Sequence, residues 1–157
     1  MQSPWKVGHC WELGPTHGGS IEGLTNYIPA SLDMGPSLYN DWKLNYHFLG
    51  SDGTVVAAHD GVIYIHSECS LEIKSGEHST YYAHIEILSS LQNNMTIKQG
   101  TEIGKIEIRP DKALFLCNWE EASYSCSTGP HLHFEVRKDG LPTVSYTHLT
   151  LPTICSV

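Results

Sequence analysis

Short stretches of β-forming residues, separated by turn residues, run through most of this chain. The stretch 54–58 leads through Asp60 and Gly61 into a second stretch, 62–65. An Asp-Gly pair between two β-prone stretches predicts a hairpin. Strands this short and evenly spaced predict an all-β domain of antiparallel sheets. Further turns are predicted at 75–76 and 138–140, and one or two turns of helix at 86–92.

Size and charge limit the possible functions. At 157 residues and 17.4 kDa the chain is long enough for one domain with its own core. The segment up to about Gly50 lacks regular patterning, so we expect a loop-rich N-terminal third. With a net charge of −8 we expect no nucleic-acid partner, because a phosphate backbone would be repelled. No apolar run approaches the roughly 20 residues that a membrane span needs.

Both ends of the chain carry information. Residues 1–6 contain no apolar segment typical of a signal peptide, so the protein is either cytosolic or a mature region whose export signal lies upstream. The segment from Val144 resembles a translated sequencing adapter. We therefore expect a single natural domain at 1–143 and a non-native tail at 144–157. His148 and Cys155 are excluded from the functional interpretation for this reason.

Ten histidines in one chain of this length indicate metal or proton chemistry, and His131-x-His133 is the sharpest case. In a strand, alternate residues project from the same face. Both imidazoles would then point one way, while Leu132, Phe134 and Val136 point into the core. Two adjacent imidazoles can bind one metal, or one can bind while its neighbour handles protons, although His-x-His alone is also compatible with two solvated polar residues.

Possible partners for these histidines lie upstream. His17 stands in a Gly-rich loop, Asp33 lies in the segment 30–35, and His84 closes a β-prone stretch, where it could transfer protons. Two His nitrogens and one carboxylate oxygen form a catalytic zinc set with the fourth position open for water. Glu22 and Asp41 remain alternative carboxylate ligands.

Four motifs occur in order along the chain, with two frame segments between them. The motifs are Thr16-His17-Gly18, Ser31-Leu32-Asp33, Tyr82-Ala83-His84 and Gly129-Pro130-His131-Leu132-His133-Phe134, and the frame segments are 55–61 and 97–104. In this combination the chain resembles the zinc endopeptidases of the lysostaphin and staphylolysin type over residues 4–143.

The resemblance implies an all-β fold with a groove across one face. It implies that His17, Asp33 and His133 hold Zn²⁺, and that His84 and His131 position or deprotonate the attacking water and stabilise the oxyanion. The expected activity is hydrolysis of Gly-rich (Gly-Gly) peptide bonds in peptidoglycan cross-bridges, with elastin-like protein as a second substrate class. We expect a secreted or periplasmic monomer.

Apart from Cys155 the chain has four cysteines, which allow three pairings, and an even count favours a secreted disulfide protein. The resemblance implies a Cys69–Cys117 bridge, and Cys10–Cys126 would then form a second bridge. Two other functions stay open. One is a non-catalytic zinc-bearing binding or regulatory module on the same scaffold. The other is a cysteine hydrolase that uses Cys126 or Cys10 with His131.

Overall fold

The structure, a computed structural model, describes the residues in five segments. For residues 12–18 and 29–36 the description is limited to the backbone and its strand pairing. The segments are 1–6, 11–18, 29–36, 52–106 and 131–143. The described residues form eleven strands and no helix, so the all-β prediction is confirmed. The described segments contain no helix that is long and apolar enough to cross a membrane.

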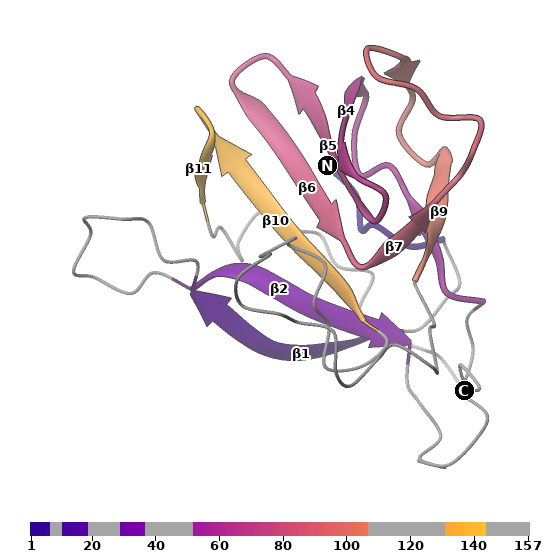
Figure 1. The fold of residues 1–157 in the computed structure, drawn as a ribbon. Helices are drawn as coiled ribbons and strands as arrows, with labels where there is room; N and C mark the ends of the chain where they lie inside the picture. Colours follow the sequence, from indigo (N-terminus) through magenta and orange to yellow (C-terminus); the bar gives the residue numbers. More distant parts are fainter. Residues whose placement is uncertain (7–10, 19–28, 37–51, 107–130, 144–157) are drawn as a thin grey trace, which may run out of the picture.

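The larger of two antiparallel sheets has eight strands. Its order is β1 (Trp11–Gly18), β2 (Pro29–Pro36), β10 (Leu132–Lys138), β6 (His78–Ala83), β5 (Ser70–Ser75), β4 (Gly61–Ser67) and β8 (Thr96–Ile97), with β11 (Leu141–Pro142) paired to β10. Strand β10 therefore lies between β2 and β6, both of which precede it by many residues in the chain, as Figure 1 shows. The strands β1 and β2 also mean that the N-terminal third contains regular structure that we did not expect.

The smaller sheet has three strands in the order β3 (Thr54–Val56), β9 (Glu102–Ile106) and β7 (Ile85–Ile87). The helix predicted at 86–92 was wrong, because Ile85 to Ile87 pair with β9 instead. A three-residue strand has little local signal, and pairing with a neighbouring strand decides its conformation.

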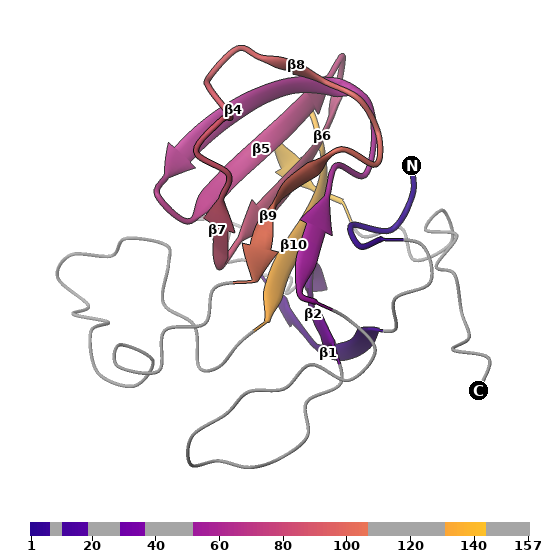
Figure 2. The same ribbon diagram turned by 90° about the vertical axis from the view of Figure 1, so that its right-hand side faces the viewer.

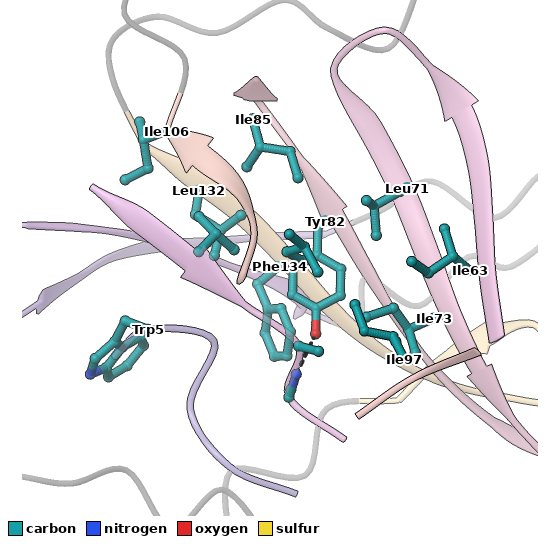
Figure 3. Packing of buried hydrophobic residues seen from close by; sticks show 14 residues of the cluster. Trp5, Ile63, Leu71, Ile73, Tyr82, Ile85, Ile97, Ile106, Leu132 and Phe134 are labelled. Carbon is teal, nitrogen blue, oxygen red and sulfur yellow. Dashed lines mark hydrogen bonds between the residues drawn. The ribbon is translucent and has the colours of Figure 1, made fainter. Parts of the chain in front are cut away.

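The hydrophobic core lies between the two sheets. Alternate residues of β4, β5, β6 and β10 meet residues of β3, β7 and β9, and the buried cluster includes Val55, Ile63, Leu71, Ile73, Tyr82, Ile85, Ile103, Leu132 and Phe134. Figure 2 shows β9 in front of β10, and Figure 3 shows the packed side chains. Burying one such side chain contributes about 1.5–3 kcal/mol. This face of β10 is thereby fixed as the interior face.

The hairpin predicted at Asp60-Gly61 was wrong. Strand β3 pairs with β9, whereas β4 pairs with β5 and β8, so the turn carries the chain from one sheet to the other. Gly61 is required here for space. A Cβ at this position would lie 2.5 Å from the carbonyl oxygen of Lys74 on the neighbouring strand.

The other two predicted turns are confirmed. Gly76 joins β5 to β6 with a φ of 61°, and Asp139 and Gly140 join β10 to β11 with φ values of 53° and 77°. Two successive positive φ values are typical of the tight turn that suits the twist of a hairpin. This hairpin ends the part of β10 that lies furthest from His131.

Candidate active site

Strand β10 presents polar side chains on the face opposite the core. Leu132 and Phe134 are fully buried between the sheets, while His133, Glu135 and Arg137 alternate with them. The face assignments predicted for this strand are therefore confirmed. His131 immediately precedes β10 and is partly buried.

Three histidine rings gather at the start of β10. The ring centroid of His84 lies 4.7 Å from that of His131 and 5.9 Å from that of His133, both in edge-to-face arrangements. The pairing of Ala83 with His133 in the two neighbouring strands brings these segments together. Sequence reasoning selected all three residues, and the structure places them in one cluster.

His84 has a special backbone conformation. It stands between the end of β6 and the start of β7, where the chain passes from the large sheet to the small one. Its φ is 64°, in the left-handed region that non-glycine residues rarely adopt, and it is 7% exposed. Such conformations cost about 1–3 kcal/mol and cluster at functional sites. The fold therefore holds the His84 ring against the other two histidines in spite of this cost.

The backbone register places Asp33 beside this cluster. Asp33 of β2 is the Cα partner of His133 of β10, and residues directly opposite in an antiparallel pair have Cα atoms about 4.5–5.5 Å apart. His17 of β1 pairs with Ser31, which in turn pairs with Glu135. His17 thus lies two strands from β10, or about 10 Å in the direction across the strands.

The imidazole of His133 contacts a carboxylate on its own strand. His133 Nε2 lies 2.9 Å from Glu135 Oε1, and Arg137 Nε donates to Glu135 Oε2 at 2.7 Å. Burial alone would raise the pKa of Glu135, but the hydrogen bond with His133 and the charge of Arg137 outweigh it, so this pKa lies below its ordinary value. Sequence reasoning missed Glu135, although its i+2 spacing from His133 places it on the same face.

A second polar cluster lies on the same face of the sheet, centred on Glu72 of β5. Ser79 Oγ donates to Glu72 Oε1 at 2.5 Å, and His66 Nε2 lies 3.2 Å from Glu72 Oε2. Burial would raise the pKa of Glu72, but these hydrogen bonds and the charges of Lys74 and Arg137 lower it overall. Arg137 joins the two clusters, because its Nε donates to Glu135 and its Nη1 lies 4.0 Å from Glu72 Oε1. Its guanidinium lies over the Tyr81 ring at 4.3 Å.

The chemistry of the selected residues suits zinc. Two imidazoles and one carboxylate are ligands that zinc takes in catalytic sites. A zinc-binding histidine ordinarily donates its other ring N–H to a carboxylate, and His133 has such a contact with Glu135. Among the side chains that the structure describes, no three His, Cys, Asp or Glu residues form a metal-binding group. Since His17 and Asp33 are described by backbone position, the ligand set remains a prediction.

Several predicted features lie outside the described residues. These are Cys10, Glu22, Asp41, Cys117, Cys126 and the tail 144–157. Cys69 is described and buried, with no disulfide partner in the described part of the chain. The two bridges, the alternative carboxylates, the domain boundary at residue 143 and the groove therefore stay predictions.

The fold and the site together define an all-β domain with a histidine cluster on the polar face of its larger sheet. The profile of peptidase family M23 matches residues 46–144, which is more than half of the chain. The chain therefore belongs to peptidase family M23.

Individual relatives agree with this assignment. Protease LasA of Pseudomonas aeruginosa strain UCBPP-PA14 is 28% identical over 142 residues, which cover 89% of this chain and 29% of that protein. The chain thus spans less than a third of this curated relative. The solved structure of the deep-sea M23 metalloprotease pseudoalterin is 26% identical with a TM-score of 0.62, covering 91% of this chain and 73% of the other. Csd3 of Helicobacter pylori shares the fold at 20% identity and a TM-score of 0.57, covering 94% of this chain and 34% of Csd3.

Proposed function

We propose that this chain is the catalytic domain of a secreted, monomeric zinc endopeptidase that hydrolyses Gly-rich peptide bonds. The preferred substrate is the Gly-Gly bond of peptidoglycan cross-bridges, and elastin-like protein is a second substrate. The observation that carries the proposal is the packing of the His84 and His131 rings at 4.7 Å, beside a strand pair in which Asp33 is opposite His133, in a member of family M23.

In this proposal His17, Asp33 and His133 hold the zinc ion. Bound zinc would act as a Lewis acid and would lower the pKa of a water bound to it to about 7. The described part of the chain shows His133 on the polar face of β10 and the backbone of Asp33 on the adjacent strand. Peptide-bond hydrolysis is supported by the likeness to Protease LasA and to the M23 metalloprotease pseudoalterin. Secretion and the peptidoglycan substrate follow from the motif resemblance described above.

His84 and His131 carry the proton transfers. A neutral imidazole nitrogen of one accepts a proton from the attacking water and later donates it to the leaving amine. The other donates a hydrogen bond to the oxygen that becomes negatively charged, which is worth about 3–4 kcal/mol in comparable sites. No glutamate stands in a His-Glu-x-x-His arrangement, so histidines fill the role of base.

The test is hydrolysis of a soluble pentaglycine peptide by the full chain, measured as the appearance of new amino groups. We expect turnover that a zinc chelator abolishes, and its loss in His84→Ala and in His131→Ala with bound zinc unchanged. His78→Ala, at an exposed position at the start of β6, is the matched control.

Three results would contradict the proposal. Zinc binding without turnover in the wild type would favour the non-catalytic module. Turnover that resists chelation but is lost on thiol alkylation would favour the cysteine hydrolase. Full turnover in either histidine variant would remove the roles given to His84 and His131.

A further inference from the structure

We propose that Glu135 is a positioning residue that fixes the ring orientation and tautomer of His133, so that His133 offers its Nδ1 atom to zinc. The inference rests on the proposed function, because it assumes that His133 is a zinc ligand. It adds a specific role for a carboxylate that is not itself in the ligand set.

The hydrogen bond between the two side chains determines the tautomer. Glu135 Oε1 is a carboxylate oxygen and can only accept, so His133 Nε2 at 2.9 Å must carry the proton and donate it. In a neutral imidazole the other nitrogen then has the lone pair. A lone pair on Nδ1 is what binding of a metal at that atom requires.

The Glu135 carboxylate is itself held in place. Its two oxygens have separate partners, because Oε1 accepts from His133 and Oε2 accepts from Arg137 Nε at 2.7 Å. Arg137 is restrained in turn by its position over the Tyr81 ring at 4.3 Å. The Tyr81 ring also meets the His133 ring edge-on at 6.3 Å. Three alternate residues of one rigid strand and one tyrosine of the next strand thus determine where the His133 ring points.

Burial makes this arrangement effective. The side chain of Glu135 is 12% exposed and that of His133 is 22% exposed, so little water competes for their hydrogen bond. A charge-assisted hydrogen bond away from water is shorter and about twice as strong as a neutral one. An ion pair that only stabilised the strand would need no more than Arg137 and Glu135. Here one oxygen of the Glu135 carboxylate accepts from the His133 imidazole instead.

The experiment measures the zinc affinity of the purified full chain by competition with a chromophoric chelator. We expect Glu135→Ala to weaken zinc binding about 10–100-fold, the usual effect of removing the carboxylate behind a zinc-binding histidine. Glu135→Gln keeps an oxygen that can accept from Nε2, so we expect it to recover most of the affinity. Absorption spectra of the cobalt(II)-loaded chain should shift in Glu135→Ala and return towards the wild type in Glu135→Gln.

Glu72→Gln is the matched control, since Glu72 is also buried and also contacts a histidine, His66, on the same face of the sheet. We expect it to lower the thermal midpoint while leaving zinc affinity within about twofold of the wild type, because it does not touch the zinc-binding histidine. Thermal unfolding of every variant separates loss of fold from loss of affinity. If Glu135→Ala does not fold, Glu135→Met takes its place, because it fills similar space without an oxygen that accepts from Nε2, and the same loss of affinity is expected.

Failure of the inference and failure of the proposed function give different results. If the wild type does not bind zinc, the proposed function is wrong. If the wild type binds zinc and folded Glu135→Ala binds it within about twofold of the wild type with an unchanged cobalt spectrum, the role given to Glu135 is wrong. If Glu135→Gln is as weak as Glu135→Ala, acceptance of the Nε2 proton is not what matters and the inference is again overturned.

Discussion

The hydroxyl of Tyr82 accepts a hydrogen bond from the backbone N–H of Ala58 at 2.8 Å and so links the two sheets. Tyr82 belongs to β6 of the large sheet, and Ala58 follows β3 of the small sheet. Both residues are fully buried, and Figure 3 shows the bond as a dashed line in the core. Thr80 Oγ1 donates to the same hydroxyl at 3.1 Å. Thr80 Oγ1 also lies 3.0 Å from His59 Nε2, so the N–H of Ala58 is the buried donor that depends on this phenolic oxygen.

Replacing Tyr82 by phenylalanine should destabilise the fold by about 1–3 kcal/mol, because the N–H of Ala58 would stay buried without this acceptor. The measurement is the free energy of unfolding in urea. Tyr64→Phe is the control, since Tyr64 lies at the surface and its change should stay within about 0.5 kcal/mol. Equal stability of the Tyr82→Phe variant and the wild type would show that the hydroxyl does not link the sheets.

Alkaline pH should also act through Tyr82. Burial raises its pKa from 10.0 to about 12, so the unfolded chain loses this proton at a lower pH than the folded chain does. The contribution is complete below pH 10.0 and is lost as the pH rises towards about 12. Unfolding curves over this range should show a smaller loss of stability in Tyr82→Phe than in the wild type. Parallel pH profiles for the two proteins would contradict this assignment.

Acid should destabilise the fold through Glu72. Its pKa lies below the ordinary value of 4.5, so the unfolded chain takes up this proton at a higher pH than the folded chain does. The stability that Glu72 contributes is present above pH 4.5 and is lost as the pH falls through its folded pKa. Glu72→Gln should be less stable at neutral pH and should lose less stability on acidification, as measured by urea unfolding. An acid profile as steep as that of the wild type would show that other carboxylates account for the loss.

Two glycines allow a steric effect to be separated from a backbone effect. Gly61→Ala places a methyl group 2.5 Å from the Lys74 carbonyl oxygen, which forces β4 and β5 apart and should cost about 1–3 kcal/mol. Gly76→Ala meets no atom within 4 Å and bears only the penalty of its φ of 61°, about 1 kcal/mol. Thermal unfolding should therefore rank Gly61→Ala below Gly76→Ala. The reverse ranking would mean that the strands adapt at Gly61.

The zinc content of the chain tests whether Asp33, on strand β2, is a zinc ligand. If Asp33 is a ligand, Asp33→Ala should hold much less zinc per chain than the wild type after dialysis, because the remaining histidines lose the only carboxylate of the proposed set. Asp52→Ala, at an exposed position, is the control and should retain its zinc. Undiminished zinc in folded Asp33→Ala would direct attention to Glu22 or Asp41 instead.

Local sequence rules were sufficient for some of these features. The alternation along β10 predicted that Leu132 and Phe134 face the core and that His133 faces outwards, because side chains in a strand have a period of two. The turns at Gly76 and at Asp139-Gly140 followed from residues that tolerate positive φ. The motif order along the chain indicated the peptidase family, which the comparison confirmed.

Tertiary structure decided which strands pair and what each histidine contacts. Asp60-Gly61 suggested a local hairpin, but β3 pairs with β9 and β4 pairs with β5, because burying both sheet faces in one core outweighs the local turn preference. The positions of Asp33 opposite His133 and of His84 against His131 depend on pairing between distant parts of the chain. No local pattern encodes such contacts, since the register between distant strands is set by the packing of the whole sheet.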